Sequence, residues 1–212
     1  MDPTQLPRKR AAQYWYSDGI NEIAFGILLL LLGGYFYLDG SLPEGHVLHS
    51  VLGIGLVFLL VGGGMLLSRL VTFAKGRLTY PRTGFVGYPR HKAPVWARVL
   101  LATMIGGMMA FIIIRIVLSH MDIERWMPGL AGLLFGGVLF YIGVRVATLR
   151  YFLLSLIALS LGSALALGDR TGSLDNSIFF ALLGLAVILS GGCSLFLYLR
   201  TNPAPAEVSD ES

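Results

Sequence analysis

Asp18 and Glu22 are the acidic residues whose type and spacing point most directly to chemistry. They lie four positions apart in the stretch Tyr16-Ser17-Asp18-Gly19-Ile20-Asn21-Glu22, so in a helix both carboxylates share one face. A carboxylate at the edge of an apolar helix could bind a proton or a cation. The alternative is that Asp18 caps the helix and that both acids stabilise its first turn through the helix dipole.

A basic segment, residues 72–94, supplies groups that could complete such a site. It contains Lys and Arg but no acid, and it repeats a tripeptide as Tyr80-Pro81-Arg82 and Tyr88-Pro89-Arg90. Because proline fixes φ, the segment is expected to be partly stiff. It suits anionic lipid headgroups or a cytoplasmic partner, and ordinary loop charge is the alternative. The candidate site comprises Asp18, Glu22, Tyr80, Arg82 and Arg90, with Glu22 paired to Arg82.

Histidines form a second candidate cluster. His46 and His49 are three residues apart, hence neighbours on a helix, and His120 lies close to Asp122 and Glu124. Histidines with carboxylates can hold a metal, and two histidines can ligate haem. The spacing is diagnostic of neither, because polar residues are common where membrane helices end. The sequence therefore predicts no metal and no cofactor, with the three histidines as weak candidates for metal ligands.

The composition indicates what kind of protein positions these residues. Of 212 residues, 55% are hydrophobic and 13% are charged, whereas a soluble domain is about 25% charged. The single cysteine, Cys193, excludes a disulfide framework and a cysteine-rich zinc module. No phosphate-binding loop, Rossmann fingerprint or HExxH motif is present, nor a nucleophile elbow. What remains is a multi-pass membrane protein.

Six uncharged, continuously apolar stretches predict the fold. They cover residues 23–38, 47–68, 99–114, 126–144, 151–168 and 176–199; a helix needs about 20 residues to cross the hydrocarbon core. Barrel strands would alternate in polarity instead. The expected spans are about 20–38, 47–69, 96–118, 126–145, 150–168 and 176–199. The sequence thus predicts an all-α polytopic membrane bundle over residues 18–200, a cytoplasmic interfacial segment at 1–17 and a disordered cytoplasmic tail at 201–212.

The distribution of Lys and Arg predicts the orientation of these helices. Positive charge marks the cytoplasmic side, and thirteen of the sixteen Lys and Arg residues fall on one side. Arg125 and Arg170 fall on the other side, and Arg115 lies at the end of the third stretch, where it is expected to snorkel to the outer interface. Both termini are therefore predicted in the cytoplasm. The net charge of +4 follows from this topology and does not indicate nucleic-acid binding.

Glycines recur at seven-residue steps in four of the six stretches. Seven residues are nearly two helical turns, so each set forms one stripe along a helix. Small residues let helix backbones approach closely in lipid, and the stripes therefore predict dense packing; a pathway lined by them is the alternative. The predicted packing positions are Gly26, Gly33, Gly55, Gly62, Gly129, Gly136, Gly184 and Gly191.

Two segments carry a resemblance to known proteins. Residues 16–22, with the Asp18-Gly19 pair and Glu22 at the start of an apolar helix, and residues 77–86, with Tyr80-Pro81-Arg82-Thr83-Gly84, resemble segments of uncharacterised multi-pass bacterial inner-membrane proteins. The resemblance covers roughly residues 14–86. It implies a location in the bacterial inner membrane and draws attention to Asp18, Glu22 and Arg82. It implies no activity.

Three functions are compatible with these patterns. The sequence favours a non-catalytic accessory, assembly or scaffold subunit, because packing glycines abound and catalytic motifs are missing. The first alternative is a small transporter or channel, although no ionisable residue lies mid-span. The second is a lipid-modifying enzyme at the inner interface, with Asp18 or Glu22 as acid–base group beside Arg82. The expected partners are lipids, including anionic headgroups, and another membrane protein or a second copy, but not nucleic acid.

The predicted orientation can be tested by cysteine labelling of intact cells with a membrane-impermeant maleimide. Cysteines introduced at residues 39–46 are expected to react from outside, since these residues connect the first two spans on the outer side. Cysteines at residues 72–94 are expected to remain unlabelled. Reaction of the second group without the first would reverse the topology.

Overall fold

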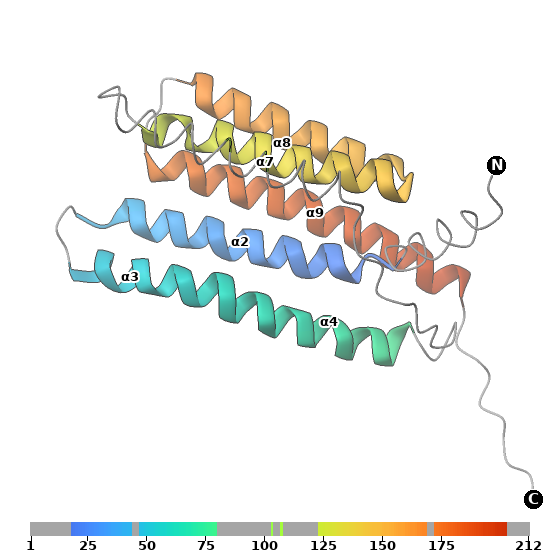
Figure 1. The fold of residues 1–212 in the computed structure, drawn as a ribbon. Coiled ribbons are helices and arrows are strands. Elements are labelled where there is room, and N and C mark those ends of the chain that lie inside the picture. Colours follow the sequence, from blue (N-terminus) through green and yellow to red (C-terminus); the bar gives the residue numbers. More distant parts are fainter. Residues whose placement is uncertain are drawn as a thin grey trace, which may run out of the picture.

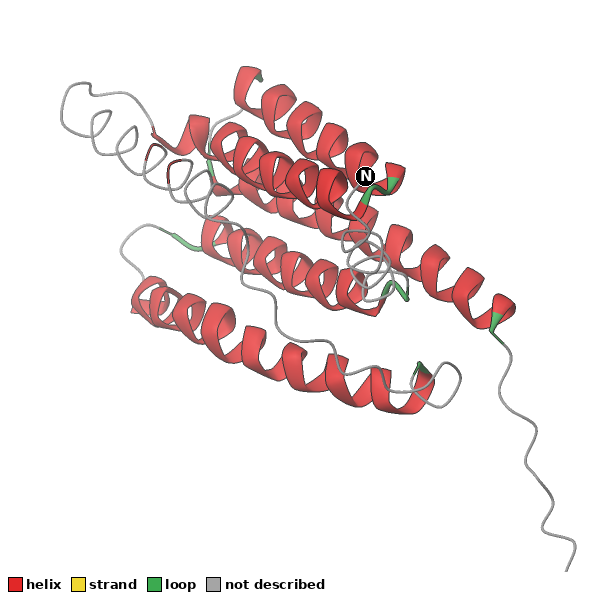
Figure 2. Ribbon diagram, turned by 45° about the vertical axis from the view of Figure 1, so that its right-hand side comes forward, coloured by secondary structure: helices red, strands yellow, loops and turns green. Residues whose placement is uncertain are grey.

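The computed structural model describes residues 18–43, 47–79, 103, 107, 123–168 and 172–202, without the side chains of residues 49, 50, 123 and 124. Every regular element in these ranges is helical (Figure 2). The helices are α2 (Ile20–Ser41), α3 (Val47–Phe58), a π-helical stretch η1 (Leu59–Gly63), α4 (Gly64–Leu78), α7 (Ile123–Val146), α8 (Leu149–Leu167) and α9 (Ser173–Thr201). Because α3, η1 and α4 are continuous, they form one long helix, called here α3–α4.

Five helices in the described ranges are long and apolar enough to cross a membrane, judged by length and composition. This confirms the predicted all-α fold for the described residues, and helices of this length and composition fit a membrane protein. The expected spans 20–38, 126–145 and 176–199 lie within α2, α7 and α9, and 150–168 agrees with α8 to within one residue at each end. The expected span 96–118 lies outside the described residues apart from two helical positions, 103 and 107, and so does the expected segment 1–17. Of the expected disordered tail 201–212, only Thr201 and Asn202 are described, and Thr201 is the last residue of α9, so the helix continues one residue into that segment.

The second helix is longer than expected. It continues past residue 69 to Leu78, so residues 72–78, interpreted above as part of a loop, are helical. The expectation was wrong because charge marks where a helix leaves the hydrocarbon core and not where it ends. Arg69, Lys75 and Arg77 are good helix formers. The long side chains of Arg69 and Arg77 are exposed and can reach the interface from a continuing helix, whereas Lys75 turns inward and is buried.

The helices lie roughly side by side, as Figure 1 shows. α9 lies between α2 on one side and the α7–α8 hairpin on the other, and α3–α4 packs on the far side of α2. α2 packs most extensively on α9, and α7 packs on α8. The end at which α2 begins, where α4, α7 and α9 end and α8 begins, is called here the site end.

Glycines bring the backbones of α2 and α9 into contact. A Cβ added at Gly26 would lie 2.7 Å from the carbonyl oxygen of Gly184, and one at Gly191 would lie 2.8 Å from that of Gly19. Gly33 approaches Ser177 and Ala181 in the same way. These antiparallel backbones therefore touch along almost the whole length of α2, which only residues without side chains allow.

The α7–α8 hairpin is joined by the same kind of contact. A Cβ at Gly132 would lie 2.8 Å from the Cα of Gly162, and one at Gly162 would lie 2.7 Å from the Cα of Gly132. Gly129 approaches Ala166 and Gly136 approaches Leu159. Six of the eight predicted packing glycines thus lie at helix contacts within these two pairs.

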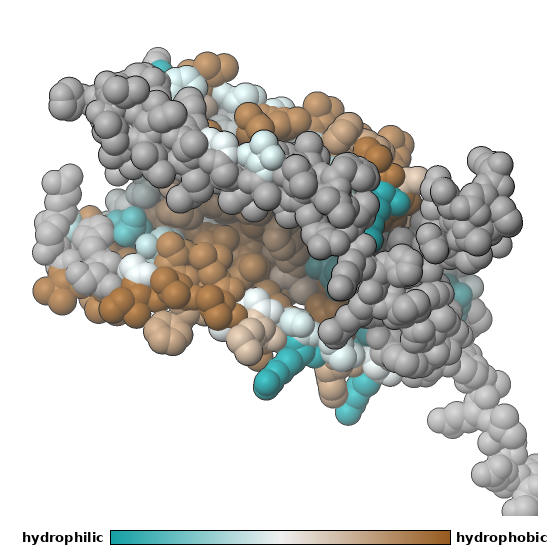
Figure 3. All heavy atoms as spheres, viewed as in Figure 1, coloured by the Kyte–Doolittle hydropathy of each residue, from teal (hydrophilic) through white to brown (hydrophobic). Residues whose placement is uncertain are grey.

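The remaining two, Gly55 and Gly62, lie on α3–α4 and have no described atom within 4 Å of an added Cβ. This helix meets α2 through side chains, with Leu56 and Leu59 packed against the core and Leu28 near Gly63. Its other faces are exposed within the described part of the chain. Where grey atoms do not cover the face seen in Figure 3, apolar residues predominate along α3–α4, with hydrophilic residues toward its C-terminal half.

We expect Gly26→Leu and Gly136→Leu to destabilise the protein, by about 1–3 kcal/mol or more, because a side chain there overlaps the facing helix. The measurement is unfolding or thermal aggregation in detergent. The matched control is Gly62→Leu, which meets no described atom and is expected to have little effect. Equal stability of all three variants would contradict the close packing of the two pairs.

Candidate functional site

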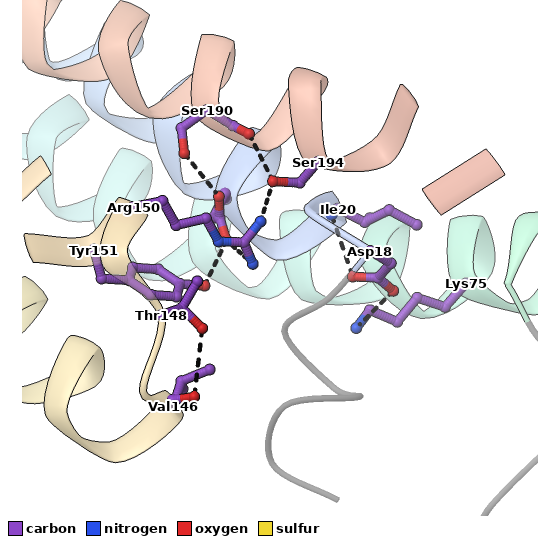
Figure 4. A network of polar contacts seen from close by, with 10 residues as sticks. Asp18, Ile20, Lys75, Val146, Thr148, Arg150, Tyr151, Ser190 and Ser194 are labelled. Atoms are coloured by element: carbon purple, nitrogen blue, oxygen red, sulfur yellow. Dashed lines mark hydrogen bonds and ion pairs between the residues drawn. The ribbon is translucent and has the colours of Figure 1, made fainter. Parts of the chain in front are cut away.

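Polar side chains from four helices converge at the site end (Figure 4). They come from the start of α2, the end of α4, the first turn of α8 and the C-terminal half of α9. Two ion pairs organise them, Asp18 with Lys75 and Glu22 with Arg150.

Gly19 sets the position of both acids. Its φ is 69°, in the left-handed region, which glycine adopts without the steric penalty of a side chain. A Cβ at this position would overlap the carbonyl oxygen of Gly191, so the turn before α2 rests directly on α9. Asp18 lies before the helix, and its Oδ1 accepts a hydrogen bond from the backbone N–H of Ile20 at 3.3 Å.

Asp18 ties α2 to the end of α4. Its Oδ2 lies 3.1 Å from Nζ of Lys75, and both side chains are only 2% exposed. The hydroxyl of Thr79 donates to the same oxygen at 3.4 Å. Asp18 therefore stabilises the start of α2 and at the same time holds the C-terminal end of α3–α4 against it.

Glu22 ties α2 to α8 and α9. Its Oε1 lies 2.9 Å from a guanidinium nitrogen of Arg150 and accepts a hydrogen bond from the Tyr151 hydroxyl at 2.5 Å. Its Oε2 accepts a hydrogen bond from the Ser190 hydroxyl at 3.3 Å. Glu22 is 6% exposed and Arg150 is 20% exposed, so the pair lies at the edge of the bundle interior.

Arg150 also donates a hydrogen bond to the Ser194 hydroxyl, which in turn donates to the carbonyl oxygen of Ser190 at 2.9 Å. The short turn between α7 and α8 aims Arg150 at this position. In that turn Ala147 has a φ of 55°, a left-handed conformation that costs a residue with a Cβ roughly 1–2 kcal/mol. The packing of α7 on α8 and the contacts of Arg150 and Tyr151 with Glu22 stabilise this conformation of the turn.

All four carboxylate oxygens of Asp18 and Glu22 accept contacts from this chain. Removing charged groups from water is costly unless they are paired and hydrogen-bonded. The arrangement meets that requirement for both carboxylates, and it joins α2, α4, α8 and α9 at one end of the bundle.

The predicted site is only partly visible in the described residues. Asp18 and Glu22 do not form one carboxylate pair: Asp18 precedes the helix and faces α4, whereas Glu22 faces α8 and α9. The residue at the helix N-cap is Gly19, although Asp18 does bind the first helical N–H. Glu22 is paired with Arg150, and the predicted partners Tyr80, Arg82 and Arg90 lie outside the described residues.

The histidine cluster also lies outside what the structure describes. His46 and His120 are not among the described residues, and of His49 only the backbone, in α3, is described. Within the described residues, no group of three or more His, Cys, Asp or Glu residues could hold a metal ion.

Sequence reasoning missed most of the network. Arg150 and Lys75 counted only as loop charges, and Tyr151, Ser190 and Ser194 were not considered. A signal was present: Ser190 and Ser194 are four residues apart in an apolar helix, so they mark one polar face in its C-terminal half. Pairing that face with Glu22, however, required knowing that α2 and α9 are neighbours.

Comparison with models of protein families, with curated proteins and with solved structures finds no match for this chain.

A double-mutant cycle on Glu22→Gln and Arg150→Gln tests the ion pair. Each single change leaves the other charge buried and is expected to cost about 3–5 kcal/mol. The double variant buries no unpaired charge, so its loss of stability should be smaller than the sum of the single losses by about 1 kcal/mol or more. The readout is the free energy of unfolding in detergent.

Arg145→Gln is the control for this cycle, because Arg145 is an exposed arginine at the end of α7. We expect a change within about 0.5 kcal/mol. Strictly additive losses for Glu22 and Arg150 would contradict a buried, coupled pair.

Proposed function

We propose that this protein is a six-span protein of the bacterial inner membrane with both termini in the cytoplasm. α4 ends at the site end and α7 begins at the opposite end, so the chain between them has to pass from one end to the other. Residues 99–114, apolar and uncharged, are the stretch suited to that crossing. The distribution of Lys and Arg supports the orientation, and the resemblance of residues 14–86 supports the bacterial location.

Within the membrane, the proposed role is that of a non-catalytic accessory, assembly or scaffold subunit. One observation supports this proposal most directly. Every carboxylate oxygen of Asp18 and Glu22 accepts a hydrogen bond or an ion-pair contact from a side chain or backbone group of this chain. A general acid or base needs an oxygen within reach of substrate. Carboxylates held in this way stabilise a fixed arrangement of helices instead.

A small transporter is the second candidate. It is favoured by the burial of Glu22 and Arg150 against apolar helices, because ionisable groups inside membrane domains often mark transport pathways. The pair lies at the end of the bundle and not at its middle, where binding sites of transporters commonly lie. This position makes the scaffold role the preferred reading.

The two roles can be separated by extracting the full chain from native membranes in polymer-bounded lipid particles and measuring particle mass. A scaffold subunit is expected to co-purify with a membrane protein at fixed stoichiometry. Separately, the purified chain should show no thermal stabilisation by small ions or metabolites. A chain recovered alone, and stabilised by a small solute, would favour the transporter.

A further inference from the structure

Four of the described helices form two pairs, α2–α9 and α7–α8, that are each joined through their backbones. In the α2–α9 pair, an added Cβ at Gly184 would lie 2.9 Å from the carbonyl oxygen of Gly26. In the α7–α8 pair, an added Cβ at Gly132 would lie 2.7 Å from the carbonyl oxygen of Ala158. The nearest atoms to these glycine positions belong to the same pair in each case. Contacts of this kind leave no room for one helix of a pair to shift against the other.

The seam between the two pairs is of a different kind, because side chains form it. The ring of Phe135 on α7 lies 6.0 Å from that of Phe25 on α2, and 6.5 Å and 5.9 Å from those of Phe179 and Phe180 on α9 (centroid distances). These rings are tilted or edge-on to one another. Aromatic side chains can change rotamer and slide while staying in contact, which backbones in contact cannot do.

Polar contacts close this seam at the site end. Glu22 is held on the α2–α9 pair by Ser190, while Arg150 and Tyr151 reach it from the first turn of α8. Arg150 also binds Ser194 of α9. We call Glu22, Arg150, Tyr151 and Ser194 the latch. Arg150 is 20% exposed, whereas Glu22 is 6% exposed, so water can reach the latch from the side of Arg150.

We propose that the α7–α8 hairpin moves as one body against the α2–α9 pair, and that the latch holds the two bodies closed at the site end. The short turn at Ala147 and Thr148 connects α7 to α8 beside the latch, so opening the latch tilts both helices of the hairpin together. The aromatic seam then acts as the surface over which the hairpin tilts. This motion does not depend on which of the proposed functions is correct.

The test measures distances between spin labels in the full chain in lipid nanodiscs. Cys193 is exposed and is first replaced by serine. One label pair, at Leu149 on α8 and Leu197 on α9, spans the two bodies near the site end; a second, at Ile27 on α2 and Leu197, lies within one body. All three positions are exposed. Glu22→Gln is compared with Asp39→Asn, an acid near the other end of α2.

Glu22→Gln is expected to lengthen or broaden the Leu149–Leu197 distance by about 1–2 Å, the scale of helix shifts in switching proteins, and to leave the Ile27–Leu197 distance unchanged. Asp39→Asn should change neither. The proposal is overturned if Glu22→Gln changes neither distance, if it changes both alike, or if Asp39→Asn has the same effect. Should Glu22→Gln fail to fold, Tyr151→Phe, which removes one hydrogen bond and no charge, is expected to give a smaller change in the same direction; no change would overturn the proposal.

Discussion

The contact on which the rest of this structure depends is the backbone contact between α2 and α9. Apolar burial gives little drive for association in lipid, so close packing has to supply it. Gly26 and Gly33 on α2, with Gly19 in the turn before it, and Gly184 and Gly191 on α9 bring the two backbones together. The first and the last of the described helices are thereby neighbours.

Both ion pairs follow from that contact. Gly19 lies against Gly191, which brings Glu22 beside Ser190 and Ser194 and turns Asp18 toward α4. A single apolar helix cannot bury a carboxylate without such partners. Glu22 is therefore satisfied only in the assembled bundle, where α9 supplies a hydroxyl and α8 supplies Arg150 and Tyr151. The close packing of α2 on α9 thus positions the charged groups, and their ion pairs and hydrogen bonds then stabilise them in the bundle.

Properties of single segments could be predicted from the sequence. The lengths of the apolar stretches predicted the five described helices, because a membrane-spanning helix is specified by its own composition. Seven-residue glycine steps gave the packing faces of α2, α7 and α9, because a stripe depends only on helix periodicity. The same rule predicted Gly55 and Gly62 as packing positions, but an added Cβ at either glycine would have no described atom within 4 Å. A stripe thus predicts that a face can be approached closely and does not identify the helix that approaches it.

The site could not be predicted in the same way, because it depends on which helices are neighbours. Arg150 follows α7 by only a short turn, yet its partners Glu22 and Ser194 lie 128 residues before it and 44 after it in the chain. The distribution of Lys and Arg predicted the side of the membrane on which Arg150 lies, but it could not predict the residues that Arg150 contacts. The contacts of Arg150 arise where the α7–α8 pair meets the α2–α9 pair, and the order of charges along the chain does not show which helices meet there.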